Sequence, residues 1–430
     1  MADRPRTRLE QKIRAAHLSQ RDVLRRFPSE ARRLGENEIA VSERQLKRWL
    51  RGGAPIPRTA AFCRVLEGWF GEPVERLLGP PDELAAPAEG GDAVAEAGRR
   101  SVEHAISSAG AIDPSALEHL QDAARRAANG CLSRPPLTML TELVQLRDTA
   151  YEQLDRTSKP RQQAELYLLA GLCCGLLTSV SFDLGHPDVA EEQARAAFTY
   201  GSVIDHPSLC AWARGLQATV ALWSGLPRRA VAAAEAGLIG APAGTSRVRL
   251  HSVRARALSL IGARDEVSAD LAAASDQLEL AGDDEFQDSV GGELLFDRSR
   301  HALCASSAYV ALNDGKRAEP AAEHAVQAFA ELPAGRRWAS GQVSATVDLG
   351  TARVLRGDLA GCEAAIRAVF GLPSAERTEG VAQRLLTLGR LVGAPRFRGA
   401  IEAAQLGENI EEFTAGSLGR TTARPAIGPS

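Results

Sequence analysis

Residues 42–53 read Ser-Glu-Arg-Gln-Leu-Lys-Arg-Trp-Leu-Arg-Gly-Gly and predict a short helix with a defined start and end. Ser42 can cap the start, because its hydroxyl can accept a hydrogen bond from a backbone amide two or three residues later. Gly52 and Gly53 predict the end, since glycine readily takes the left-handed conformation that follows many helices. Three apolar residues at i, i+3 and i+4 give the helix one buried face: Leu46, Trp49 and Leu50.

The other side of this predicted helix is polar and cationic. Its residues are Glu43, Arg44, Gln45, Lys47, Arg48 and Arg51. A short, capped helix that is cationic on one side and anchored to a core on the other suits insertion into a DNA major groove. The alternative is a solvated basic helix without a nucleic-acid partner, and the context of the stretch has to separate the two interpretations.

Charge is distributed unevenly along the 430 residues. Residues 1–79 contain 17 Lys and Arg against 10 Asp and Glu, a net charge of +7, whereas the remainder carries −10. A basic segment followed by an acidic body places any contact with nucleic acid in the first segment.

The cysteine and hydropathy patterns indicate the cellular compartment of the protein. The seven Cys residues are scattered, odd in number and without a Cys-x-x-Cys motif, which favours reduced thiols over a disulfide framework. There is no apolar core of a signal peptide and no run of 18 uncharged apolar residues. We therefore expect a cytoplasmic, nucleoid-associated protein with no membrane partner.

Residues 1–79 have the pattern of a compact unit of five helices. A capped helix start lies at Leu18-Ser19-Gln20, followed in order by the stretch at 42–53, by Pro57-Arg58-Thr59 and by a short closing helix at 71–79. These landmarks resemble the phage-repressor-like (xenobiotic-response-element type) helix-turn-helix. The loop from about residue 27 to residue 41 is longer than the tight turn usual in that family.

The resemblance implies roles for individual residues of the predicted recognition helix. Residues near its start would meet base edges, where Arg can bind guanine and Glu can accept from cytosine: Glu43, Arg44 and Arg48. The remaining polar residues would contact phosphates or groove edges: Gln20, Gln45, Lys47 and Arg51. The DNA-binding domain is therefore assigned to residues 1–79, with double-stranded DNA as the partner.

The rest of the chain is expected to be helical as well. Residues 80–111 are rich in Pro, Ala, Gly and acidic residues and predict a linker that can hold one helix. From residue 112 to residue 405 helix follows helix without a convincing strand, which makes the fold class all-α. Residues 406–430 are expected to be a flexible tail.

Residues 160–393 contain a sequence repeat. Small residues recur seven before, five after and twelve after five glycines, each of which separates two predicted helices: Gly185, Gly225, Gly262, Gly315 and Gly357. Pro320, Gln327 and Val369 depart from this pattern. Small residues at these spacings let paired antiparallel helices pack closely and stack on the next pair. The pattern resembles a tetratricopeptide-repeat solenoid, with spacings of 40, 37, 53 and 42 residues instead of the usual 34. The alternative is an irregular Ala-rich helical bundle.

A solenoid of this kind presents a concave groove from the first helix of each pair. The resemblance places groove residues 13, 10, 6 and 3 before each glycine, which for Gly262 gives a polar, cationic set. The candidate ligand residues are Arg249, Ser252 and Arg256, with Tyr309 from a neighbouring repeat. Such a lining suits an anionic ligand or a peptide carboxylate; the alternative is ordinary solvated helix surface.

Signals for catalysis and for metal binding are weak. The eight His residues are dispersed, no HExxH, GxSxG or Gly-rich phosphate loop occurs, and the acidic stretch at 283–288 is expected to be a solvated loop. We expect no catalytic residues, no metal and no cofactor. The whole resembles actinobacterial transcriptional regulators, some of them repressors. It therefore predicts a homodimeric regulator that senses a small molecule or peptide. The alternative is a protein-interaction scaffold whose first domain docks protein or binds DNA only weakly.

Overall fold

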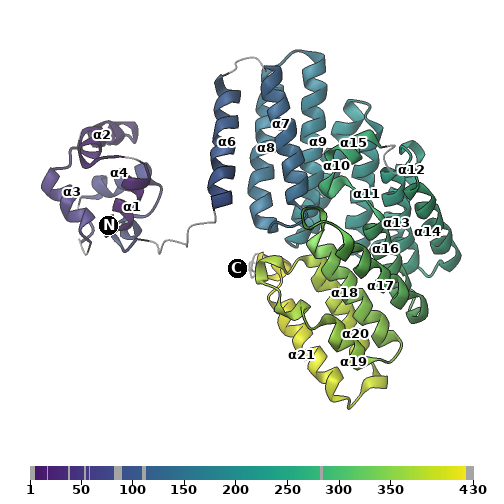
Figure 1. The fold of residues 1–430 in the computed structure, drawn as a ribbon. Coiled ribbons are helices and arrows are strands. Elements are labelled where there is room, and N and C mark those ends of the chain that lie inside the picture. Colours follow the sequence, from purple (N-terminus) through teal and green to yellow (C-terminus); the bar gives the residue numbers. More distant parts are fainter. Residues whose placement is uncertain are drawn as a thin grey trace, which may run out of the picture. The chain divides into compact units, whose positions relative to one another are not determined.

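The computed structural model describes residues 5–16, 18–36, 39–52, 55–57, 59–81, 90–108, 113–280 and 284–422. Over these ranges the chain is all-α, with short 3-10 turns and no strand, as predicted (Figure 1). The contacts divide it into two compact units, Met1–Arg99 and Arg100–Ser430. Of the predicted linker, residues 82–89 and 109–112 lie outside the described residues, and the segment between them forms helix α6, Gly90–Ser108.

The first unit consists of five helices around an aromatic core. They are α1 (Arg8–Ala15), α2 (Gln20–Arg33), α3 (Glu43–Leu50), α4 (Ala60–Phe70) and α5 (Val74–Leu78). Phe27, Trp49, Phe62 and Trp69 form a cluster in which neighbouring ring centroids lie 5.7–6.5 Å apart. Phe27 and Trp49 are buried, and the partly buried Phe62 and Trp69 pack against them, which gives this small unit a core of its own.

Local signals set the start of α2 and the closure of the unit. Ser19 and Asp22 form a reciprocal capping box at the start of α2, which continues through Pro28 without ending there. Glu72, in the turn before α5, binds Arg8 at 2.8 Å and Lys12 at 2.9 Å. Their hydrogen bonds and charges lower the pKa of the Glu72 carboxyl to about 2. These ion pairs therefore join α1 to the turn between α4 and α5.

The second unit, which we call the repeat body, is a sequential array of antiparallel helix pairs (Figure 1). The pairs are α7 (Pro114–Gly130) with α8 (Pro136–Arg156), α9 (Pro160–Asp183) with α10 (Pro187–Val203), α11 (Pro207–Trp223) with α12 (Pro227–Gly240), α13 (Thr245–Leu260) with α14 (Arg264–Leu278), α16 (Arg298–Ala311) with α17 (Gly315–Glu331), α18 (Ala339–Leu355) with α19 (Leu359–Ile366), and α20 (Glu379–Val392) with α21 (Ile401–Ala415). The single-turn 3-10 helices η2 (Ala334–Arg336), η3 (Val369–Gly371), η4 (Ser374–Glu376) and η5 (Pro395–Phe397) lie between or within later pairs.

Four of the five predicted glycines occupy the turn within a pair. Gly185, Gly225, Gly262 and Gly357 all have φ between +74° and +88°, the left-handed region that only glycine adopts without strain. The small residues at the predicted spacings around them, such as Ala218 and Ala230, are fully buried between helices. The helical-repeat architecture is thus confirmed.

At the fourth turn, the predicted position of the left-handed residue is wrong by two residues. Gly315 is the first residue of α17, and the left-handed position of this turn is taken by Asn313 at φ +54°. Asparagine tolerates this region because its short polar side chain can bond locally. Counted from Asn313, the small residues seven before, five after and twelve after are Ser306, Ala318 and Ala325, all fully buried.

The long spacing before this turn comes from an insertion. Helix α15 (Glu285–Val290) and the 3-10 turn η1 (Gly292–Leu294) lie between α14 and α16. Asp284 caps α15, is 1% exposed, and accepts hydrogen bonds from Ser208 on α11 at 2.5 Å and from Ser246 on α13. The prediction of a solvated acidic loop was therefore wrong for Asp284: two hydroxyls from neighbouring pairs compensate its burial.

The predicted flexible tail from residue 406 is also contradicted as far as residue 422. Leu406, Ile410 and Phe413 on α21 are buried against α18–α20. A further short helix, α22 (Leu418–Thr422), follows. Leu418 donates a backbone hydrogen bond to the carbonyl of Arg377 and packs into the core formed by α7–α9 and α11. Burial of these apolar side chains outweighs the Gly- and Thr-rich composition on which the prediction rested.

Because Leu418 reaches the early helices, the repeat body closes on itself. A Cβ atom added to Gly185, after α9, would lie 2.3 Å from the Cα of Gly419 on α22, so the backbones meet there. On another side, the backbone amide of Ala339, the first residue of α18, donates a hydrogen bond to the carbonyl of Leu132 after α7 at 2.9 Å. The inner side of the array is consequently a partly enclosed cavity instead of a long open groove.

Helix α9 is the central apolar element of the repeat body. Among the described residues it is the one helix whose length and composition would allow it to cross a membrane. However, 78% of its most apolar window is buried inside the protein. Gly175 on this helix lets the ring of Trp212 on α11 approach so closely that a Cβ would lie 2.1 Å from it. These contacts are typical of a core helix.

Candidate functional site: a cationic helix face and an enclosed cavity

The first candidate site is the outer face of α3. Ser42 caps the helix as predicted, with its hydroxyl accepting from the amide of Gln45 at 3.2 Å, and Gly52 follows it at φ +84°. Leu46, Trp49 and Leu50 are buried, which confirms the apolar face. The opposite face presents exposed Glu43, Arg44, Lys47, Arg48 and Arg51, and a half-buried Gln45.

The cations on this face differ in how strongly they are paired. Lys47 forms an ion pair with Glu43 one turn earlier and is the main cause of the lowered pKa of that carboxyl. Arg44, Arg48 and Arg51 have no carboxylate partner among the described residues. Exposed guanidinium groups of this kind keep all of their donors available to a ligand.

The start of α2 lies close to the start of α3. Gln20 is exposed at the first position of α2, as predicted. Its neighbour Arg21 is exposed too and contributes to lowering the pKa of Glu43 on α3. Arg21 therefore belongs to the same cationic face. The sequence did not single it out, although its place beside Gln20 could have indicated it.

The second candidate site is a cavity of about 170 Å³ inside the repeat body. From α9 through α20, every helix that lines it is the first of its pair; the turn after α7, the start of α8, η1 and the segment around η4 also contribute. The first helices thus line the inner side, as expected of a solenoid. The lining alternates apolar side chains with buried charges.

Five arginines line the cavity: Arg134, Arg249, Arg256, Arg300 and Arg384. Arg300 is paired with Glu293 on η1 at 3.0 Å, so the insertion supplies one counter-charge. Arg249 is 4% exposed and donates to the backbone carbonyls of Glu293 and Leu294, both at 2.9 Å, while its Nε has no partner. Burial, and secondarily repulsion by Arg300, lower the pKa of Arg249 to about 10.

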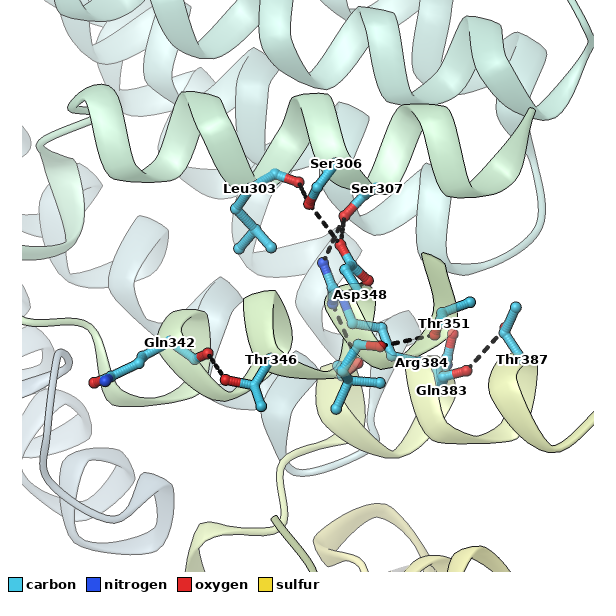
Figure 2. A network of polar contacts seen from close by, with 12 residues as sticks. Leu303, Ser306, Ser307, Gln342, Thr346, Asp348, Thr351, Gln383, Arg384 and Thr387 are labelled. Atoms are coloured by element: carbon cyan, nitrogen blue, oxygen red, sulfur yellow. Dashed lines mark hydrogen bonds and ion pairs between the residues drawn. The ribbon is translucent and has the colours of Figure 1, made fainter. Parts of the chain in front are cut away.

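Arg384 is held by a network that extends over three helices (Figure 2). Asp348 on α18 is 3% exposed and lies 3.3 Å from the Nε of Arg384 on α20. Ser306 and Ser307 on α16 donate to the same Asp348 oxygen at 3.0 and 2.5 Å, and Arg384 donates to the hydroxyl of Ser307 at 3.3 Å. The network positions Arg384 at the cavity wall.

Trp223, at the end of α11, lies beside two of the guanidinium groups. The Cζ of Arg256 is 4.8 Å from the centroid of the Trp223 ring, and that of Arg384 is 4.7 Å from it. Both distances are within the range of cation–π attraction. Arg256 has no carboxylate partner among the described residues, and its charge contributes to lowering the pKa of Arg384 to about 10, an effect led by burial.

Asp183, the last residue of α9, faces the same cavity. No ion pair or hydrogen bond to its carboxyl occurs within the described part of the chain. Burial, followed by repulsion from Glu293 and Glu379, raises the pKa of Asp183 to about 8. A raised pKa favours the neutral acid, which can both donate and accept a hydrogen bond.

Two of the four predicted ligand residues line the cavity and two do not. Arg249 and Arg256 do. Ser252 is fully buried between helices and bonds to the Nδ1 of His301 at 2.9 Å. Tyr309 packs against the core of α13, α14 and α16. The prediction that Tyr309 faces the inner side was wrong, because a shift of two residues along an α-helix turns a side chain by roughly 200° around the helix axis. In the corrected register Ser307 takes the position six before the turn.

The described residues give little support for a metal site or a reactive thiol. No group of three or more His, Cys, Asp or Glu side chains there is arranged to hold a metal ion. The seven Cys residues are free thiols, four of them buried, and burial raises the pKa of Cys304 in the cavity wall. Sequence reasoning missed Asp183, Trp223 and Arg384, since α20 comes close to the early helices α9 and α11 only through the folding of the whole array.

Comparison with models of known protein families gives no match to this chain, and comparison with curated proteins gives none either.

Proposed function

We propose that the protein is a sequence-specific DNA-binding transcriptional regulator, acting as a repressor, without enzymatic activity. The observation that carries this proposal is the outer face of α3. The helix is capped, anchored by three buried residues, and exposes three arginines that have no carboxylate partner among the described residues. An exposed Arg can form two hydrogen bonds with the O6 and N7 of guanine, and Lys and Arg together neutralise phosphates.

The repeat body would serve assembly and sensing. A single small unit covers about half an operator, and a lone module of this kind buries only roughly 600–1,000 Å² on DNA. Pairing two units through the repeat body would raise their effective concentration at adjacent half-sites. We propose a cytoplasmic homodimer that binds a near-palindromic site, with the partly enclosed cavity as the place where a small molecule or peptide acts.

The test is a mobility-shift titration on a site selected from genomic fragments, at several salt concentrations. Arg44→Ala and Arg48→Ala should each weaken binding and relax the preference at one or two base pairs. The matched control is Arg64→Gln on α4. Arg64 is exposed and pairs with Glu36, beyond the far end of α2, which at 14 residues is roughly 21 Å from Gln20. Wild-type binding by both α3 variants would show that this face does not read DNA.

Light scattering of the full chain, alone and on the selected site, tests the assembly. A dimer that binds two half-sites agrees with the proposal, whereas a monomer on DNA contradicts that part of it. An absence of sequence-selective, salt-dependent binding would instead favour the interaction scaffold, in which the first unit docks protein.

A further inference from the structure

We propose that the partly enclosed cavity of the repeat body is a binding site for a small organic anion with an apolar body, such as a carboxylate on an alkyl or aromatic group. As an effector site, this inference rests on the proposed function. As a binding site, it stands on the contacts within the repeat body alone.

The first argument is the imbalance of charge in the cavity wall. Arg134, Arg300 and Arg384 each have a carboxylate partner, Glu142, Glu293 and Asp348, whereas buried Arg249 and half-buried Arg256 have none among the described residues. Arg249 is 4% exposed and retains a donor, Nε, without a partner. Buried charges are normally paired, because an unpaired charge away from water is costly. A ligand anion would supply the missing counter-charge.

The second argument is the arrangement of the guanidinium groups around Trp223. Arg256 and Arg384 both lie within 5 Å of the centroid of this one ring, close enough to repel each other. A carboxylate can accept from both groups, and charge-assisted hydrogen bonds of this type are the stronger ones in proteins. The ring and its two cations therefore form a preformed receptor for an anionic head group.

The third argument concerns size and the rest of the ligand. Apolar side chains from three helices and from the insertion continue the wall beyond the arginines, among them Leu216, Val253, Phe296 and Val343. The cavity volume of about 170 Å³ exceeds the space that one water molecule needs by roughly tenfold. The contacts of Leu418 and Gly419 with the early helices narrow the inner side of the array. A partly enclosed cavity of this volume favours a compact molecule over an extended peptide, which would need a long open groove.

Calorimetric titration of the full-length protein tests the proposal with four probes that separate charge from apolarity. Octanoate and 1-naphthoate carry both features, octylammonium carries the opposite charge, and acetate lacks the apolar body. We expect saturable binding of octanoate or 1-naphthoate and at least tenfold weaker binding of octylammonium and acetate. Equal binding of octanoate and octylammonium, or no saturable binding of either anion, would overturn the proposal.

Variants then locate the binding. Arg256→Ala should weaken binding of the anionic probe roughly tenfold or more, since a hydrogen bond to a charged group is lost, and Arg256→Lys should restore part of it. Arg228→Ala on α12 is the matched control, because Arg228 is an exposed arginine outside the cavity wall. Unchanged affinity in Arg256→Ala would place the anion elsewhere and refute the site.

Measuring anion binding and DNA binding on the same full-length protein distinguishes a failure of this inference from a failure of the proposed function. Anion binding that depends on Arg256, in a protein without selective DNA binding, supports the cavity site and contradicts the regulator. Selective DNA binding without anion binding supports the regulator and contradicts the cavity site.

Discussion

Arginine is used in opposite ways in the two units of this protein. On α3 of the first unit, Arg44 and Arg48 are exposed and have no carboxylate partner among the described residues. In the repeat body, Arg249 and Arg384 are buried and held by carbonyls, a carboxylate and aromatic rings. An exposed guanidinium group retains its hydration and affects stability little, whereas a buried one must be compensated within the fold. The two sets should therefore respond differently to the same type of substitution.

The largest effect is expected for Asp348→Ala in the repeat body. The substitution removes the carboxylate partner of buried Arg384 and the acceptor of two serine hydroxyls (Figure 2). Breaking a buried pair from one side costs about 3–5 kcal/mol of unfolding free energy, because the remaining charge stays uncompensated. Chemical denaturation of the full chain measures this cost.

The matched control for Asp348→Ala is Asp155→Ala. Asp155 is exposed near the end of α8, so its loss should change stability by less than about 0.5 kcal/mol. Equal effects of the two substitutions would show that Arg384 does not depend on Asp348.

The second effect is a pH dependence that differs between the two units. The pKa of Asp183 is raised to about 8 in the folded repeat body, from an ordinary value of 3.8 for an aspartate in an unfolded chain. As the pH rises from about 4 to 8, the unfolded chain has already lost this proton while the folded chain still holds it, so the repeat body should lose stability. Each pKa unit corresponds to about 1.4 kcal/mol, which allows a loss of a few kcal/mol. Asp183→Asn should flatten the stability curve between pH 5 and pH 9.

In the first unit the sign is reversed. The pKa of Glu72 is lowered from 4.5 to about 2, so its contribution is complete above pH 4.5 and is lost as the pH falls towards 2. Glu72→Gln should therefore leave the slope between pH 5 and pH 9 unchanged. If Asp183→Asn also leaves that slope unchanged, then the carboxyl of Asp183 is ionised in the folded protein.

The third effect concerns the exposed arginines and appears in DNA affinity. On the proposed function, Arg44→Ala and Arg48→Ala should each cost about 1–3 kcal/mol of binding free energy on the selected site. Neither residue belongs to the buried face of α3, so thermal unfolding should occur at the wild-type temperature. Loss of stability together with loss of affinity would mean that these side chains support the fold.

The two units also differ in how much of them could be predicted from sequence. The boundaries and the buried face of α3 follow from local signals, namely the Ser42 cap, the Gly52 turn and the i, i+3, i+4 spacing. The polar residues of its outer face follow from the same periodicity. Local rules suffice there because the site lies on a single helix, with Arg21 on α2 as the addition that needed the structure.

The cavity depends on contacts between distant residues, and sequence reasoning found only part of it. Arg249 and Arg256 were located from a turn whose glycine, Gly262, does adopt the left-handed conformation. The prediction for Tyr309 was wrong because Asn313 takes the left-handed position in the turn between α16 and α17. The prediction counted from Gly315, two residues later. The closure by α22 was missed altogether, since composition alone does not reveal that residues near 418 pack on helices formed more than two hundred residues earlier.

The smallest effect on stability is expected for Arg256→Ala, and it is informative because it is small. Arg256 gains attraction from the Trp223 ring, which contributes about 0.5–2 kcal/mol in such contacts, and it experiences repulsion from Arg384. The two terms oppose each other, so the unfolding free energy should change by less than about 1 kcal/mol, within the range of ordinary substitutions. Arg249→Ala, which removes a buried group bonded to two carbonyls, should cost more. Denaturation of both variants without ligand measures the difference. A large loss in Arg256→Ala would identify this arginine as part of the structural framework. A small loss, together with weaker anion binding, would show that its charge is kept in the cavity for a ligand.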